Sequence, residues 1–242
     1  MTTAIILAGG LGTRLRGVVD NLPKPMAPIN NRPFLEFVIN YWINQGVKHF
    51  HLSVGYMHEK IISHFKNKYK NIPITYTIEK TPLGTGGGLK MSINDIPPCD
   101  NFLLLNGDTF FGASLEKIIK FHDMYNSTLT MSLFKFNESD RFGEIILDNS
   151  KNVVGIKSNS HSCFGYANSG VYFFNTSSLR IILEKFNKEK FSLENDIISH
   201  LLINKCVVKA IKFNESFIDI GLPKDYALSS CFFNKMDKNY EI

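Results

Sequence analysis

The 242-residue chain predicts a three-layer α/β fold, in which helices cover both faces of a doubly wound, mostly parallel sheet. Short apolar runs alternate with longer helical patterns through residues 1–127, as they do where crossover helices join parallel strands. A glycine-rich segment follows the first apolar run directly. After residue 127, turns join successive apolar runs, which predicts a mixed α+β portion built onto the same sheet.

In the first part, apolar spacing separates the helices from the strands. The apolar positions of residues 34–45 have helical spacing, and Gly46 ends this helix. A second glycine-rich stretch, residues 83–88, is expected to be a loop that leads into a helix. We expect strands at 4–7, 50–54, 74–78 and 102–105, and helices at 34–45, 59–65, 89–93 and 115–124.

The second part contains strands joined by turns, one of them at Asp148-Asn149. We expect strands at 128–136, 144–147, 153–157, 171–174, 206–213 and 216–220, and a helix at 193–203. The last two strands are expected to complete the sheet. With 44% hydrophobic residues and no linker rich in Pro, Gly or Ser, residues 1–242 are expected to form one domain.

Charge and cysteine content limit the classes of partner. The net charge of +5 is mild, and the densest lysine run, residues 66–70, is interpreted as a solvated helix end rather than a nucleic-acid contact. The cysteines form no CxxC pair, which argues against a zinc site or a disulfide framework; they are Cys99, Cys163, Cys206 and Cys231. A small anionic substrate suits this chain better than a polynucleotide does.

The first residues carry no basic n-region, so we expect no targeting signal there. Its apolar stretch, Ala4–Ala8, stops at two glycines and is too short for a signal peptide or a membrane span. We therefore expect a cytoplasmic protein without a membrane or nucleic-acid partner. The oligomeric state stays open, and a homo-oligomer is compatible with the sequence.

Residues 7–15 have the composition of a phosphate-binding loop. Glycines let the backbone approach a ligand, successive N–H groups can bind an anion, and Arg14 can add a bidentate contact. Leu15 stands where a GxGxxG fingerprint needs its last glycine, and the chain has no GK[ST] Walker sequence. Alone, the segment is equally compatible with an ordinary turn. The following Pro23-Lys24-Pro25, which is expected to hold Lys24 in an extended segment, makes the combination more specific.

Gly9-Gly10-x-Gly12-Thr13-Arg14-Leu15 followed by Pro23-Lys24-Pro25 resembles the signature of the sugar-1-phosphate nucleotidyltransferases, and the resemblance covers nearly the whole chain. It implies the Rossmann-like fold of the nucleotide-diphospho-sugar transferases, with a nucleotide-binding part at 1–127 and a sugar-phosphate-binding part at 128–242. It also implies that Arg14 binds the departing pyrophosphate and that Lys24 bridges the reacting phosphates. The nucleotide contacts implied here are Leu7, Ala8, Gly9, Gly10, Gly12 and Thr13.

Two aspartates are candidate metal ligands. Asp108 follows an apolar strand, at the sheet edge where open α/β folds bind ligands; a turn aspartate that caps the next helix is the less favoured alternative. Asp219 lies between Ile218 and Ile220, where burial of a lone charge is costly unless a cation is near; an exposed edge strand is the alternative. Leu105–Asp108 and Asp219–Gly221 resemble the two metal-binding positions of the family, which implies a Mg²⁺ site formed by both aspartates.

The remaining motifs concern the base and the sugar. Residues 79–88 resemble the family loop that holds base and ribose; the implied contacts are Glu79, Gly84, Thr85 and Gly87. Residues 141–144, 168–170 and 194–197 resemble sugar-binding segments, although each alone is an ordinary turn or helix start. The implied sugar-phosphate contacts are Asn106, Gly143, Lys157, Asn168 and Glu194. Many members carry E-K-P near Lys157, whereas this chain reads GIKSN at residues 155–159, so Lys157 is expected to keep the phosphate contact without the glutamate.

The expected reaction is in-line attack of a sugar 1-phosphate oxygen on the α-phosphate of a nucleoside triphosphate. The segments Gly12–Arg16, Pro25–Asn30, Pro33–Glu36 and Asn106–Phe111, with the compact length, most resemble the heptose 1-phosphate guanylyltransferases within the family. This resemblance implies GTP and D-glycero-α-D-manno-heptose 1-phosphate as substrates and a nucleotide sugar for surface polysaccharide as product. Three alternatives stay open. They are another base or sugar, such as mannose 1-phosphate, a non-catalytic nucleotide-sugar sensor, and a glycosyltransferase, although the last ordinarily has an Asp-x-Asp motif that residues 106–108 lack.

Overall fold

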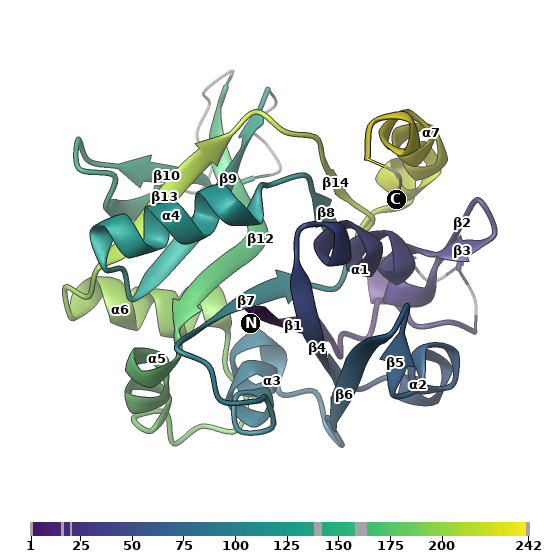
Figure 1. The fold of residues 1–242 in the computed structure, drawn as a ribbon, viewed down its shortest axis with the longest axis horizontal. Coiled ribbons are helices and arrows are strands. Elements are labelled where there is room, and N and C mark those ends of the chain that lie inside the picture. Colours follow the sequence, from purple (N-terminus) through teal and green to yellow (C-terminus); the bar gives the residue numbers. More distant parts are fainter. Residues whose placement is uncertain (1, 16, 20, 138–141, 158–163, 241–242) are drawn as a thin grey trace.

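The computed structural model describes residues 2–15, 17–19, 21–137, 142–157 and 164–240, the last four of these in backbone only. Ten of its strands form one sheet (Figure 1). They are β1 (Thr2–Ala8), β4 (Val47–Val54), β5 (Lys68–Tyr69), β6 (Ile72–Ile78), β7 (Asn101–Asn106), β9 (Leu129–Phe136), β10 (Glu144–Leu147), β11 (Val153–Lys157), β12 (Gly165–Asn175) and β13 (Val208–Phe213). Their order is β11-β10-β12-β7-β1-β4-β6-β5, and β9 pairs with both β12 and β13.

The centre of the sheet is parallel, as the alternating pattern predicts. Strand β1 lies between β4 and β7 and is parallel to both, and β6 continues the parallel set beyond β4. Strand β12 pairs antiparallel with β7 and so joins the second part of the chain to the first. In Figure 1, β13 near the C-terminus lies beside β9 from the middle of the chain, and the two are parallel. The predicted fold class is confirmed.

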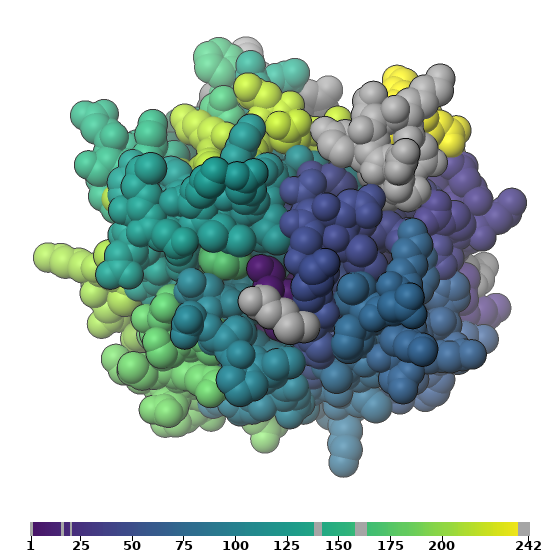
Figure 2. All heavy atoms as spheres, viewed as in Figure 1, coloured from purple at the N-terminus to yellow at the C-terminus, as the bar shows by residue number. Residues whose placement is uncertain are grey.

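Helices cover both faces of this sheet, and two apolar cores lie between the layers. Alternate residues of β1 enter different cores, with Ile6 packed in the core of α1 and Ile5 in the core that contains Leu89 of α3. The helices are α1 (Phe34–Asn44), α2 (His58–Phe65), α3 (Gly84–Ser92), α4 (Leu115–Tyr125), α5 (Thr176–Leu183), α6 (Ser199–Ile203) and α7 (Pro223–Tyr240). In the space-filling view only a small part of the purple N-terminal strand is visible between blue and teal side chains (Figure 2).

Several element predictions need correction. The predicted loop at 83–88 is wrong, because α3 begins at Gly84 and its glycines occupy the first turns of the helix. The last predicted strand is β14 (Phe217–Asp219), which pairs with β8 (Thr109–Phe111) in a separate small sheet instead of completing the main one. Residues 193–203 are helical as predicted, but the first six form a π-helical turn, η3 (Leu193–Ile198), before α6.

Among the described residues, Cys99, Cys206 and Cys231 are free thiols, and Cys163 lies outside them. The lysine run at 66–70 is not a continuous helix end, since Lys66 follows α2 and Lys68 lies in β5. None of the described helices is both long enough and apolar enough to cross a membrane.

Candidate active site

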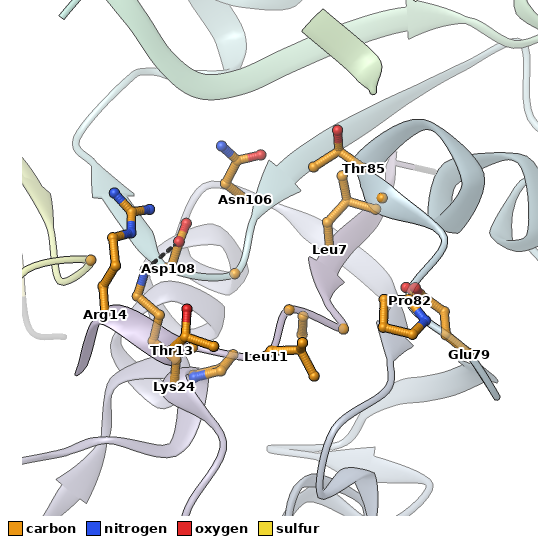
Figure 3. Close-up of a pocket in the computed structure, with 18 of the residues that line it drawn as sticks. Leu7, Leu11, Thr13, Arg14, Lys24, Glu79, Pro82, Thr85, Asn106 and Asp108 are labelled. Carbon is orange, nitrogen blue, oxygen red and sulfur yellow. Dashed lines mark hydrogen bonds and ion pairs between the residues drawn. The ribbon is translucent and has the colours of Figure 1, made fainter. Parts of the chain in front are cut away.

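A cavity of about 430 Å³ opens at the carboxyl ends of β1 and β7 (Figure 3). It forms there because the glycine loop leaves β1 at the centre of the sheet, and Gly107 brings the end of β7 against it. The Gly107 N–H donates to the Leu7 carbonyl at 2.9 Å, and a Cβ on Gly107 would lie 2.6 Å from that oxygen. Open α/β sheets bind ligands at this edge.

Most of the predicted nucleotide contacts meet at this cavity. Its lining includes Leu7, Ala8, Gly9, Gly10, Gly12, Thr13, Glu79, Gly84 and Thr85 from the predicted set. The predicted residues Arg14, Lys24, Asn106 and Asp108 also line it. Of the implied nucleotide contacts, only Gly87 does not, because it faces a different cavity behind α3.

The cavity has two chemically different ends (Figure 3). Arg14, Lys24 and Asp108 lie together at one end, whereas Glu79 and Pro82 lie at the other. We call the first the charged end and the second the α3 end, since Pro82 lies two residues before that helix begins. A nucleotide that lies along the glycine loop would therefore have its phosphates at one end and its base at the other.

Lys24 is held rigidly at the charged end. Its segment is a 3-10 turn, η2 (Lys24–Met26), rather than the extended segment predicted, and the Met26 N–H donates to the Pro23 carbonyl. Gly12, with a φ of +60°, packs on Lys24, where a Cβ would lie 3.1 Å from the lysine Cβ. The Lys24 side chain is only 9% exposed, and its Nζ lies 2.5 Å from Oδ2 of Asp108.

The structure brings Asp108 and Asp219 together, which their sequence spacing cannot show. Asp219 lies opposite Thr109 in the β8–β14 pair, and the Ile220 N–H donates to the Asp108 carbonyl at 3.0 Å. The Gly221 N–H donates to Oδ1 of Asp219 at 2.6 Å. Within the described part of the chain no group of three or more His, Cys, Asp or Glu residues could hold a metal ion. The candidate metal ligands at this site are therefore the two carboxylates of Asp108 and Asp219. Two carboxylates leave room for the phosphate oxygens and waters that Mg²⁺ usually keeps.

Glu79 connects three segments around the α3 end. Its Oε1 accepts from the Ser53 hydroxyl at 2.9 Å, and its Oε2 accepts from the Leu83 N–H at 3.3 Å. Gly9 and Gly88 lie so close to this carboxylate that neither has space for a Cβ. Glu79 therefore joins β4, the turn before α3 and the glycine loop, whatever further contact it makes with a base.

In the region predicted to bind the sugar, a partly buried hydrogen-bond chain joins Asn168 to the cavity. The Asn168 amide donates to the Tyr172 hydroxyl at 2.6 Å, and that hydroxyl donates to Oε1 of Glu194 at 3.0 Å. Thr85, which lines the cavity, donates to Oε2 of Glu194 at 3.2 Å. Burial and the nearby charge of Glu194 raise the pKa of Tyr172 well above its ordinary value, so the phenol stays protonated and continues to donate.

Sequence reasoning missed Tyr172, because a tyrosine within an apolar strand carries no signal of a polar role. Asn106 also belongs to this region, since a Cβ on Gly170 would lie 2.6 Å from the Asn106 amide nitrogen. Residues 168–170 are not the turn that the sequence suggests but part of β12, whose pairing with β9 shifts register between Asn168 and Tyr172. The close approach of Asn106 explains the glycine at 170, where φ is +77°.

Gly143 and Lys157 lie away from the cavity lining. Gly143 precedes β10, and a Cβ there would lie 3.2 Å from Ile156. Lys157 ends β11, is exposed and pairs across the strands with Glu144. The neighbouring Arg141 and residues 158–159 lie outside the described residues, as does Arg16 beside the glycine loop.

The glycines of α3 pack against protein and not only against the cavity. A Cβ on Gly84 would lie 2.6 Å from the Phe191 carbonyl oxygen, and one on Gly87 would lie 2.7 Å from the Glu189 carbonyl oxygen. This segment also brings Lys190 into the cavity lining, a residue that no sequence motif marked. Gly84 and Gly87, which the resemblance implies as nucleotide contacts, are thus also required by the close packing of residues 189–191.

Comparison with known proteins agrees with this site. A sequence model of the family described as nucleotidyl transferase matches residues 3–235. A D-glycero-alpha-D-manno-heptose 1-phosphate guanylyltransferase from Aneurinibacillus thermoaerophilus is 41% identical over 223 residues, which cover 92% of this chain and 94% of that enzyme. The Campylobacter jejuni enzyme of the same description is 40% identical over 228 residues, which cover 92% of this chain and 96% of that enzyme.

A solved structure has the same fold. HddC from Yersinia pseudotuberculosis is 34% identical, with a TM-score of 0.84 over 96% of this chain and 100% of that one. HddC has also been solved in complex with GMP-PN, and that complex superposes on this chain with a TM-score of 0.83. The family match, the two curated relatives and the convergence of the glycine loop with Lys24 and Asp108 lead to one conclusion: the chain belongs to the nucleotidyl transferase family and is a sugar-1-phosphate nucleotidyltransferase.

Proposed function

We propose that this enzyme transfers a guanylyl group from GTP to D-glycero-α-D-manno-heptose 1-phosphate and releases pyrophosphate. The observation that carries the proposal is one cavity in which the glycine loop, Arg14, Lys24 and Asp108 meet, with Asp219 joined to Asp108 through the backbone. The choice of guanine and heptose is supported by the 41% and 40% identical relatives, whose descriptions name that activity. We expect the reaction to take place in the cytoplasm, where nucleoside triphosphates are made.

In the proposed reaction a phosphate oxygen of the sugar phosphate forms a bond to the α-phosphorus of GTP. The bond between that phosphorus and the oxygen bridging to the β-phosphate breaks, and the electron pair leaves with pyrophosphate. The attacking phosphate is largely ionised at neutral pH, so no general base is needed. What the protein must supply is positioning and positive charge, which Lys24 provides between the reacting phosphates and Arg14 provides at the leaving pyrophosphate.

The carboxylates of Asp108 and Asp219 fit a Mg²⁺ ion. Both are hard oxygen ligands; Asp108 lies in the turn just before β8, Asp219 ends the neighbouring β14, and the Asp108 side chain, which lines the cavity, is 36% exposed. When bound, Mg²⁺ would neutralise charge on the triphosphate. Lys24 holds one oxygen of Asp108, which keeps the carboxylate in place before substrate arrives.

The sugar phosphate is proposed to bind beside the register shift of β12 between Asn168 and Tyr172, within the part formed by residues 128–242. Asn168 and Glu194 are the side chains proposed to meet the sugar, together with Asn106, the backbone of Gly143 and the ammonium group of Lys157. The partly buried link from Asn168 through Tyr172 to Glu194 supports this arrangement, because it holds two polar side chains next to the nucleotide cavity. The nucleotide-binding part is residues 1–127.

The test is a pyrophosphate-release screen of the purified protein. GTP, ATP, UTP and dTTP are each combined with heptose, mannose and glucose 1-phosphates, with and without Mg²⁺. We expect the highest kcat/KM for GTP with the heptose phosphate and no turnover without a divalent ion. A preference for another base or sugar would contradict the substrate assignment, and binding of a triphosphate without turnover would favour a non-catalytic sensor.

A further inference from the structure

Lys190 is an uncommitted cation in the wall of the nucleotide cavity. It lines that cavity together with Pro82, Gly84 and Thr85, and it is exposed. Within the described part of the chain its ammonium group has no hydrogen-bond or ion-pair partner, in contrast to Lys24, which is paired with Asp108. An unpaired lysine that faces a ligand cavity is available to the ligand.

The backbone that carries Lys190 is fixed against the start of α3. The Phe191 N–H donates to the Leu83 carbonyl at 3.0 Å, and the Gly86 N–H donates to the Phe191 carbonyl at 3.0 Å. The missing Cβ atoms of Gly84 and Gly86 create the space for this approach, since either would collide with Phe191. Lys190 therefore lies beside the α3 end of the cavity.

Packing on the following residues fixes the segment further. The Phe191 ring is buried and stacks on Phe186 with centroids 5.0 Å apart. The Leu193 N–H donates to the Thr85 hydroxyl at 2.8 Å, which ties the chain to α3 a second time. These contacts hold the Lys190 backbone beside the start of α3, so we expect its side chain to meet ligand atoms at the α3 end, near Pro82 and Thr85.

Those atoms belong to the base, because the α3 end lies opposite the charged end formed by Arg14, Lys24 and Asp108 (Figure 3). Guanine presents two acceptors on one edge, O6 and N7, whereas adenine presents an N6 donor beside N7. An ammonium group can only donate, so it attracts the first edge and opposes the second. We propose that Lys190 recognises the O6/N7 edge of guanine and selects GTP over ATP; this inference rests on the proposed function.

The test compares two lysines that lie two residues apart. Lys190→Met removes the charge and keeps the length of the side chain. Lys188→Met is the matched control, because Lys188 lines the separate cavity behind α3 with Lys80 and Lys90. Steady-state kcat/KM is measured for GTP, ITP and ATP with the same sugar phosphate. ITP keeps O6 and N7 but lacks the 2-amino group, so the ITP/ATP ratio excludes any contact to that amine.

Lys190→Met is expected to lower both the GTP/ATP and the ITP/ATP ratio of kcat/KM by about 10- to 100-fold. The loss should appear in the KM for GTP with little change in kcat, because a base contact is equally strong in the ground and transition states. Lys190→Arg should retain most of the preference, and Lys188→Met all of it.

Two results would overturn the inference. Unchanged ratios in Lys190→Met would mean that Lys190 does not meet the base. An equal fall of kcat/KM for all three nucleotides would place its ammonium group on the phosphates or ribose. A wild-type enzyme that does not prefer GTP would instead contradict the proposed function, and the wild-type measurement alone reveals that failure.

Discussion

The Lys24 ammonium group lies 2.5 Å from the Asp108 carboxylate, so the two charges at the centre of the site neutralise each other before any substrate binds. The pair has a physical reason, since a lysine that is 9% exposed loses hydration and needs a partner. When substrate binds, phosphate oxygens can replace Asp108 as the partner of Lys24, and a metal ion can replace Lys24 as the partner of Asp108. Neither charge is then left without a partner. The pair thus keeps both groups positioned for exchange with substrate.

Lys24→Met is expected to lower kcat by about 10²- to 10³-fold, because it removes a preorganised charge at the reacting phosphates. The measurement is pyrophosphate release at saturating substrates, with circular dichroism to verify the fold. Lys120→Met is the control, since Lys120 pairs with Glu116 at the same 2.5 Å distance but on the exposed surface of α4. Near-normal turnover in Lys24→Met would remove Lys24 from the mechanism.

Asp219→Asn should raise the Mg²⁺ concentration needed for half-maximal activity by about 10-fold or more, because an amide is a weaker ligand for a hard cation. The substitution keeps an oxygen that can accept from the Gly221 N–H. Activity is measured across a Mg²⁺ titration, with Asp123→Asn on the exposed side of α4 as the control. Identical titration curves would exclude Asp219 from the metal site.

Gly87 and Gly10 should respond differently to replacement by alanine. Gly87→Ala is expected to destabilise the protein by about 1–3 kcal/mol, since its Cβ would overlap the Glu189 carbonyl and Leu83. Nothing lies within 4 Å of a Cβ on Gly10, so Gly10→Ala should unfold at the wild-type urea concentration while binding GTP more weakly. Equal urea midpoints for the two variants would contradict the packing explanation for Gly87.

Tyr172→Phe removes the hydroxyl that joins Asn168 to Glu194. Two partly buried polar groups, the Asn168 amide and the Glu194 carboxylate, lose a partner, so we expect a loss of about 1–3 kcal/mol in the free energy of unfolding. If the link positions the sugar site, KM for the sugar phosphate should rise more than KM for GTP. Steady-state kinetics in both substrates decide this, and an equal rise in both constants would count against a positioning role.

Acid should destabilise the protein through two buried histidines. Burial lowers the pKa of His51 and of His122 from 6.5 to about 4. Between pH 6.5 and 4 these histidines bind protons in the unfolded chain but not in the folded chain. Their contribution to the free energy of unfolding is therefore complete above pH 6.5 and is lost as the pH falls toward 4. The loss is on the order of 3 kcal/mol for each histidine. NMR titration of the folded protein measures both values, and a pKa near 6.5 would contradict the prediction.

Much of the nucleotide half could be predicted, because its signals are local. A strand that ends in glycines, a lysine between prolines and an apolar strand that ends in Asp108 are each encoded by consecutive residues, and backbone sterics decide what such segments do. The parallel order of the central strands follows from alternating strands and helices. The glycine-rich start of α3 was predicted wrongly for a related reason: glycine favours loops, and only contact with Phe191 overrides that preference.

By itself the sequence predicted the fold class, which the structure confirms, and marked the glycine loop, Arg14, Lys24 and Asp108 as candidate site residues, which the structure brings to one cavity. Only the tertiary structure decided that Asp219 lies beside Asp108, that Tyr172 joins the sugar side to Thr85, and that Lys190 faces the cavity. The physical reason is that these relationships arise from strand pairing and side-chain packing between segments far apart along the chain. Residue spacing carries no information about such contacts until the sheet has assembled.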